Sequence, residues 1–118
     1  MSRTAWGRKA PDFFWKQGDT APAIAEQLLD GTGTAVVLTG AAVRFIGYFP
    51  GAASAEINAV ATITDAATGK VSYTPVTADT DTIGDLMVEW QVTFGGGAIE
   101  TFPNSGHQKV RITDDLAS

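Results

Sequence analysis

The sequence predicts an all-β protein, an antiparallel β-sandwich of seven to eight short strands. Short runs rich in Val, Ile, Thr and aromatic residues recur along the chain, and turn residues separate them at near-regular spacing. No segment requires a helix of ordinary length. The 118 residues suit one domain, and a 44% hydrophobic content that includes three Trp and six Phe is enough for one two-layer core.

The longest predicted strand runs from residue 86 to residue 94, where residue types alternate most regularly. Large apolar side chains fall on one face and mostly polar side chains on the other, as in a strand with one buried face. The expected inward residues are Leu86, Val88, Trp90, Val92 and Phe94. We therefore expect this strand to supply much of the core.

The N-terminal part of the domain predicts two further strands. Residues 12–16 form a short aromatic run, which Gly and Pro at 17–22 end in a turn. Residues 24–29 would suit a helix by propensity, but their alternation and short length favour a strand. A turn at 30–33 then leads to residues 35–38, which we expect to form an edge segment.

Turns that contain Gly, Pro or Asp separate the remaining predicted strands. These strands cover residues 43–49, 57–63, 70–74, 99–102 and 108–113, with hairpin turns at 65–69 and 95–97. Alternation places Val43, Phe45, Val110 and Ile112 inward, and Phe49 is a further candidate for the core.

The segment before the long strand has residues suited to a corner of the sandwich. Tyr73 has a large apolar body and a hydroxyl group that needs a polar partner. Asp79 and Thr80 can accept and donate hydrogen bonds within a tight loop, and Gly84 can adopt a backbone conformation that other residues avoid. We expect all four residues to be structural.

Charge is unevenly distributed along a chain whose net charge is -5. Residues 1–16 carry four basic residues and one acidic residue, whereas the remainder carries four basic and twelve acidic residues. We therefore divide the chain into a flexible basic N-terminal arm, residues 1–11, and one sandwich domain, residues 12–118. The arm is either a frayed terminus or a segment that docks onto an acidic neighbouring copy. The acidic body argues against nucleic-acid binding.

Composition also limits the compartment and the chemistry. Without cysteine, the chain cannot form disulfides, a thiolate zinc site or a cysteine nucleophile. No stretch approaches the roughly 20 apolar residues of a membrane helix, and the basic N-terminus is not followed by the apolar region of a signal peptide. We expect cytoplasmic synthesis and no membrane partner.

The motifs that suggest chemistry are incomplete. Residues 79–85 place carboxylates at alternate positions, as a calcium loop does, but Ile83 and Trp90 occupy positions that need oxygen ligands. His107 has no Gly-x-Ser-x-Gly elbow near it. Residues 95–97 lack the Lys and the helix of a phosphate-binding loop. We therefore predict a non-enzyme with no metal and no cofactor.

An aromatic cluster near the N-terminus is the main candidate for protein contacts. Successive side chains of a strand point to opposite faces, so Phe13 and Trp15 can share one face while Phe14 points the other way. The cluster either covers the end of the sandwich or forms an exposed patch for a neighbouring subunit. The interface candidates are Arg3, Trp6, Arg8, Lys9, Phe14 and Trp15.

The order of short motifs along residues 13–116 resembles a known family. The motifs are Gly18-Asp-Thr-x-Pro22, Leu28-x-Asp30-Gly, Val36-x-Leu38-Thr-Gly40, Val43-x-Phe45, Gly69-Lys-Val-x-Tyr73, Asp79-Thr80, Gly84, Glu89-Trp90, Thr101-Phe-Pro-Asn-Ser-Gly106 and Val110-x-Ile112. In this order and spacing they resemble the Ig-like domain at the N-terminus of tailed-phage baseplate upper proteins and in related small virion proteins.

This resemblance implies an Ig-like sandwich and a non-enzymatic structural role in a bacteriophage virion. Because no stalk or receptor-binding segment follows before Ser118, we expect a small capsid decoration or head-fibre-base subunit. The alternatives are a tail or baseplate adaptor, and a carbohydrate-binding or host-adhesion module that uses Trp6, Trp15, Tyr48 or Phe49 for stacking. Expected partners are other virion proteins, either the major capsid protein or tail and baseplate proteins, within a homo-oligomer such as a trimer.

Overall fold

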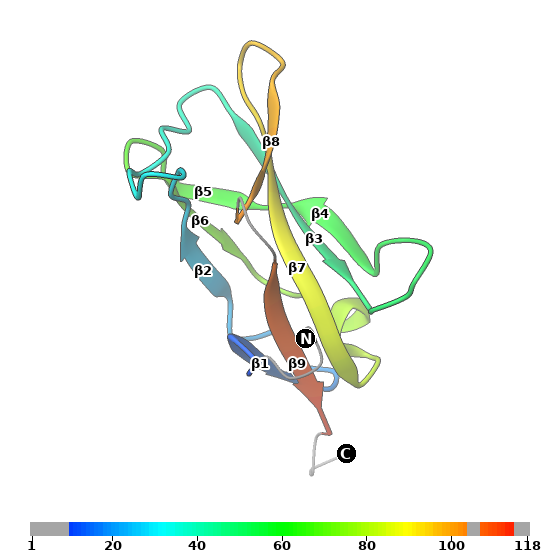
Figure 1. The fold of residues 1–118 in the computed structure, drawn as a ribbon. Coiled ribbons are helices and arrows are strands. Elements are labelled where there is room, and N and C mark those ends of the chain that lie inside the picture. The colour runs from blue at the N-terminus through cyan, green and yellow to red at the C-terminus, as the bar shows by residue number, and fades with distance from the viewer. Residues whose placement is uncertain (1–9, 104–106, 115–118) are drawn as a thin grey trace.

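The computed structural model describes residues 10–103 and 107–114, which form two β-sheets packed around one core (Figure 1). The larger sheet has the strand order β1-β9-β7-β3-β4, and β8 pairs with the part of β7 that β9 leaves open. The smaller sheet has the order β2-β6-β5. This all-β sandwich confirms the fold class predicted from the alternation and the turns.

The described strands are short, with the exception of β7. Their bounds are β1 Phe13–Lys16, β2 Ile24–Gln27, β3 Ala42–Tyr48, β4 Ile57–Val60, β5 Thr62–Asp65, β6 Lys70–Tyr73, β7 Gly84–Thr93, β8 Ile99–Phe102 and β9 Gln108–Thr113. A short 3-10 helix, η2, covers Thr77–Thr80. Within the part of the chain that the structure describes, no helix is long and apolar enough to cross a membrane.

Strand β7 organises the larger sheet. It is ten residues long and pairs along one edge with β3, while its other edge pairs first with β9 and then with β8. Its inward side chains Leu86, Val88, Trp90 and Val92 are all 0% exposed, as their alternation predicted. Phe94 lies just past the end of the strand and is partly buried against the core.

Strand β1 departs from the antiparallel pattern, because it lies parallel to β9. The register places Phe13 beside Val110 and Trp15 beside Ile112, so the inward side chains of the two strands align. From β1 the chain passes into β2 of the smaller sheet. Since no hairpin joins β1 to β9, no turn fixes their relative direction. Every other strand pair of the described residues is antiparallel.

Residues 57–63, predicted as one strand, are divided between the two sheets. Strand β4 pairs with β3 in the larger sheet, and β5 pairs with β6 in the smaller one. Between them Ala61 is buried, and its N–H donates to the carbonyl of Val43 (N···O 2.9 Å). The inward alternation continues from Ile57 through Ala61 to Ile63, so the sequence pattern does not reveal where the chain changes sheets.

Residues 35–38 also differ from the expected edge segment, because they form only an isolated bridge. The N–H of Val36 donates to the carbonyl of Leu28 (2.9 Å), whereas the N–H of Leu38 donates to the carbonyl of Ala66 (2.8 Å). Donors two residues apart thus reach two different segments, which prevents a ladder. The segment still contributes to the core, since Leu38 is 1% exposed.

Aromatic side chains from both sheets meet at the centre of the core. Phe45 of β3 stacks on Tyr73 of β6, with ring centroids 4.6 Å apart and planes 8° from parallel. On its other side Phe45 meets Trp90 of β7 edge to face at 4.9 Å. Trp15 of β1 lies 6.4 Å from Phe45. This group joins the two sheets, because Tyr73 comes from the smaller sheet and the other three side chains come from the larger one. Aromatic pairs of this kind stabilise a protein beyond the area that they bury.

The Tyr73 corner forms as the sequence predicted. The hydroxyl of Tyr73 and the N–H of Val76 both donate to Oδ2 of Asp79. The hydroxyl of Thr80 donates to the carbonyl of Asp19 (2.9 Å), which ties η2 to the turn after β1. Tyr73, Asp79 and Thr80 are all buried, so these polar groups satisfy one another inside the protein.

Gly84 begins β7 in a conformation that favours glycine, with φ at +150°. A Cβ atom added at this position would lie 3.0 Å from the ring of Phe49. Phe49 is partly buried against the core rather than fully inside it. Glycine at this position therefore lets the strand begin beneath an aromatic ring.

Gly69, between β5 and β6, provides a test of close backbone packing. Its φ is +71°, and an added Cβ would lie 2.6 Å from the carbonyl oxygen of Val36 and 2.9 Å from that of Leu28. We expect Gly69→Ala to lower the free energy of unfolding by about 3 kcal/mol or more, because it adds a backbone clash to the left-handed strain.

Gly33→Ala is the matched control for this substitution. Gly33 has φ at +85°, yet an added Cβ would meet no atom within 4 Å. Only the strain of the left-handed backbone conformation remains, so we expect Gly33→Ala to lower the free energy of unfolding by about 1–2 kcal/mol. Urea denaturation of the two variants measures the difference, and equal losses would contradict the close contact at Gly69.

Tyr73 makes the stability of the domain fall as the pH becomes alkaline. Burial, followed by the hydrogen bond to Asp79, raises the pKa of Tyr73 above its ordinary value of 10.0. The unfolded chain therefore loses the Tyr73 proton at a lower pH than the folded chain does. The stabilisation from the buried, protonated hydroxyl is full below pH 10 and declines as the pH rises above 10. From about pH 9 to about pH 11, wild-type protein should lose about 1.4 kcal/mol more unfolding free energy than Tyr73→Phe. Urea denaturation at both pH values checks this, and identical pH dependence would disprove it.

Candidate functional site

The structure describes two of the six predicted interface residues and places them in opposite environments. The other four lie outside the described residues: Arg3, Trp6, Arg8 and Lys9. Phe14 lies on the outward face of β1 and is 57% exposed. Trp15 points the opposite way into the core and is 1% exposed.

Trp15 is therefore a core residue of this domain and not a surface contact. Its indole Nε1–H donates to the carbonyl of Pro22 (2.9 Å), which satisfies the polar atom inside the protein. The alternation along β1 separates it from Phe14. The burial of Trp15 and the partial burial of Phe49 also weaken the expected sugar-stacking set, of which Tyr48 is 37% exposed.

Phe14 lies beside a group of ion-paired residues on the outer face of the larger sheet. Its register partner on β9 is Arg111, whose guanidinium donates to Asp85 through Nε (2.9 Å) and through a terminal nitrogen (3.1 Å). Lys109 Nζ lies 3.1 Å from the same carboxylate and is 1% exposed. Hydrogen bonds from Arg111, and then from Lys109, lower the pKa of Asp85, so this carboxylate stays ionised.

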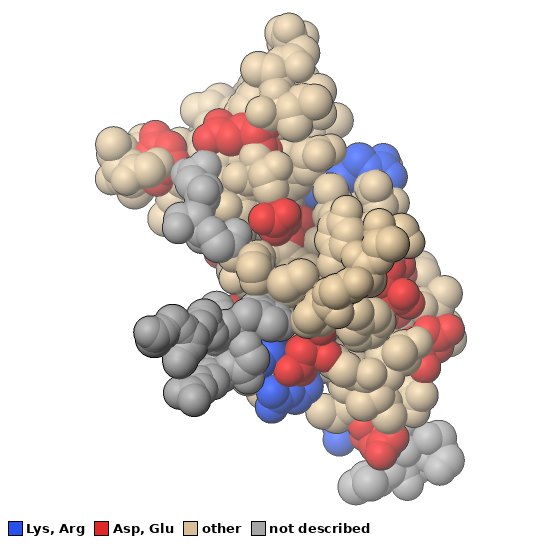
Figure 2. All heavy atoms as spheres, turned by 45° about the vertical axis from the view of Figure 1, so that its right-hand side comes forward, with Lys and Arg blue, Asp and Glu red and all other residues tan. Residues whose placement is uncertain are grey.

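Acidic side chains dominate the surface elsewhere. Figure 2 shows one face of the molecule, on which Asp and Glu side chains are spread over most of the length while Lys and Arg gather in a few places. This agrees with twelve acidic and four basic residues after residue 16. The described surface therefore suits basic partners better than acidic ones.

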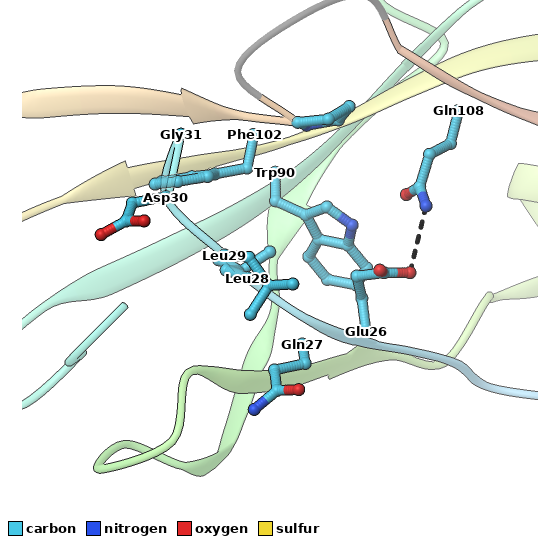
Figure 3. A pocket seen from close by; sticks show the side chains of 10 residues that line it. Glu26, Gln27, Leu28, Leu29, Asp30, Gly31, Trp90, Phe102 and Gln108 are labelled. Carbon is cyan, nitrogen blue, oxygen red and sulfur yellow. Dashed lines mark hydrogen bonds between the residues drawn. The ribbon is translucent and has the colours of Figure 1, made fainter. Parts of the chain in front are cut away.

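A pocket of about 360 Å³ opens where the end of β2 faces the junction of β7, β8 and β9 (Figure 3). Its apolar walls include Leu28, Trp90 and Phe102. Glu26 and Asp30 also line it, and no Lys, Arg or His is among the described residues around it. The pocket is therefore apolar in its walls and acidic in its charged groups.

Two polar atoms at this pocket are buried without a hydrogen-bond partner among the described residues: Trp90 Nε1 and Gln108 Oε1. The amide nitrogen of Gln108 donates to Oε1 of Glu26 (3.1 Å), as the dashed line in Figure 3 shows. Sequence reasoning placed Trp90 in the core but gave no sign of this site. Glu26 and Gln108 are 82 residues apart, and neither belongs to a local motif.

Asp30 is held in place by the turn after β2. Its Oδ1 accepts hydrogen bonds from the N–H of Thr32 (2.9 Å), the N–H of Thr34 (3.0 Å) and the hydroxyl of Thr32 (2.7 Å). These bonds, that of the Thr32 hydroxyl first, lower the pKa of Asp30. Asp30 thus borders the pocket with its carboxylate held in the adjoining turn.

The residues singled out for metal or catalytic chemistry do not come together. Asp79 serves the Tyr73 corner, whereas Asp85 pairs with Arg111. Within the described ranges, no group of three or more His, Cys, Asp or Glu side chains could hold a metal ion. His107 directly precedes β9.

The fold and its pocket define a small two-sheet β-sandwich domain. Neither a family model nor a curated protein sequence matches this chain. Among solved structures, its fold is similar to the N-terminal domain of phage TP901-1 ORF48, with a TM-score of 0.61. The similarity covers 92% of this chain and 91% of that domain at 13% sequence identity. The similarity therefore extends over the whole sandwich, and it is a similarity of fold.

The opposite environments of Phe14 and Trp15 can be tested by substitution. We expect Trp15→Ala to lower the free energy of unfolding by about 3–5 kcal/mol, because it leaves a cavity in the core. Phe14→Ser should change it by no more than about 0.5 kcal/mol, because the ring is largely in solvent. Urea denaturation measures both values, and a large loss for Phe14→Ser would mean that this ring supports the fold.

Proposed function

We propose that this protein is a non-enzymatic structural component of a tailed-bacteriophage particle, where it binds other virion proteins. The observation that carries the proposal is the fold similarity to a domain of a phage protein across 92% of this chain. Independent support comes from the order of motifs, which resembles phage virion proteins. A likeness of fold alone admits many functions, so the proposal depends on the agreement of these two observations.

Three of the described carboxylates support a structural rather than a catalytic role. Asp79 accepts bonds at a buried corner, Asp85 is paired with two basic residues, and Asp30 closes its own turn. Each is occupied by protein groups that hold strands or turns together. A general acid or base instead needs a proton-transfer position that faces a substrate.

The tail is the location that we propose first. The motifs resemble the N-terminal domains of baseplate upper proteins, and the fold similarity is also to an N-terminal domain of a phage protein. Together these two observations favour a tail adaptor over the head position that we expected from the sequence. The expected position on the head, as a capsid decoration or head-fibre base, is the alternative. In either place the protein would occupy symmetric sites, which favours a homo-oligomer such as a trimer.

Phe14 is the described side chain that we propose for contact with a virion partner. It combines a large exposed aromatic ring with the neighbouring Arg111, which is paired with Asp85 on the next strand. Aromatic residues and arginine are enriched at the centres of protein interfaces. This surface therefore offers an apolar anchor with charges that orient a partner.

Immunogold labelling of assembled phage particles with an antibody against this chain tests the proposal. We expect gold at the tail tip, and gold on the capsid would support the head alternative. Purified particles without label in either place, although the antibody detects the free protein, would disprove the structural role. Pre-immune serum is the control for background.

A substitution then tests the proposed contact. We expect Phe14→Ser protein to be incorporated into particles at least about tenfold less than wild type, as for an interface anchor. Ile99→Ser is the matched control, since Ile99, the first residue of β8, is also a large apolar side chain and is 63% exposed. Equal incorporation of both variants would exclude Phe14 from the interface.

A further inference from the structure

We infer that the pocket between β2 and the junction of β7, β8 and β9 binds the basic N-terminal segment of this chain, residues 1–9. This segment sits either in its own pocket or in that of a neighbouring copy. The inference goes beyond the proposed function, because the contact concerns this chain alone and holds whether or not the protein is part of a phage particle.

The two unpartnered polar atoms at the pocket favour an occupant that has both a hydrogen-bond acceptor and a donor. Trp90 is 0% exposed, yet its Nε1–H has no acceptor among the described residues. Gln108 Oε1 likewise has no donor there. Figure 3 shows the indole of Trp90 projecting between the side chains of Leu28, Glu26 and Gln108. A peptide backbone offers both missing groups, the carbonyl for Trp90 and the N–H for Gln108.

The charges of the pocket select a basic occupant. Glu26 and Asp30 contribute carboxylates, and no basic side chain is among the described residues that line the pocket. The N-terminal segment carries Arg3, Arg8 and Lys9 and no acidic residue. Carboxylates and guanidinium groups form the stronger, charge-assisted hydrogen bonds. These two carboxylates would repel an acidic occupant.

The described chain just after this segment lies close to the pocket. The N–H of Asp12 donates to the carbonyl of Lys109 (2.8 Å), and the N–H of Lys109 donates to Asp12 Oδ2 (2.9 Å). Since β1 is parallel to β9, the described residues before Asp12, Ala10 and Pro11, lead back toward Gln108, which lines the pocket. Nine extended residues span up to about 30 Å. An extended segment of that length is long enough to cross a pocket with a volume of about 360 Å³.

The test uses the full-length chain with its own segment weakened by Arg3→Gln, Arg8→Gln and Lys9→Gln. The probe is a synthetic peptide with the wild-type sequence of residues 1–9. The chain has three tryptophans, so indole N–H signals in ¹⁵N-correlated NMR spectra report on Trp90 directly. We expect the peptide to shift the Trp90 signal and to leave that of Trp15 unchanged, because Trp15 already donates to Pro22.

Pocket variants of this host test where the peptide binds. Glu26→Gln removes the charge but still accepts the bond from Gln108, and we expect it to weaken binding about tenfold. Glu56→Gln is the matched control, because Glu56 is exposed between β3 and β4 and makes the same change in charge. It should leave the affinity unchanged.

Three results would overturn the inference. One is an unshifted Trp90 signal when the peptide is added at its solubility limit. Another is equal weakening by Glu26→Gln and Glu56→Gln, which would mean general charge attraction. The third is a Trp90 shift caused by N-acetylglucosamine but not by the peptide. Sedimentation then assigns the pocket: a wild-type monomer places the segment in its own pocket, and an oligomer lost in the triple variant places it in a neighbour's.

Discussion

The aromatic packing of Phe45 against Tyr73 and Trp90 joins the two sheets, and the other buried features of the sandwich are built around it. Phe45 and Trp90 come from the larger sheet and Tyr73 from the smaller one, so this contact sets how closely the layers approach. Tyr73 is also fixed at its hydroxyl by Asp79. The same ring therefore connects the core to the corner that leads into β7, and disturbing it would affect both.

Trp90 links this core to the candidate binding site. One part of its indole packs against Phe45, while its nitrogen lies at the pocket without a partner among the described residues. A buried donor of this kind costs stability unless something accepts from it. The position is consistent with a residue that must serve both the packing of the domain and the binding of another segment.

Alternation was sufficient to predict much of the fold, because the inward and outward faces of a strand differ in composition. It predicted the inward set of β7 and the opposite directions of Phe14 and Trp15. It missed the change of sheet at Ala61, since the inward period continues across that residue. It also missed the pocket, because Glu26 and Gln108 meet only through the pairing of distant strands. Long-range geometry of this kind leaves no mark in local sequence.

The parallel pairing of β1 with β9 determines how the domain responds to mechanical load. These strands lie near the two ends of the chain, with matching directions over four residue pairs. A force that pulls the ends apart draws the strands past each other along their length. Their hydrogen bonds, which cross between the strands, are then loaded together rather than opened one at a time. The domain thus resists extension most strongly along the common direction of β1 and β9.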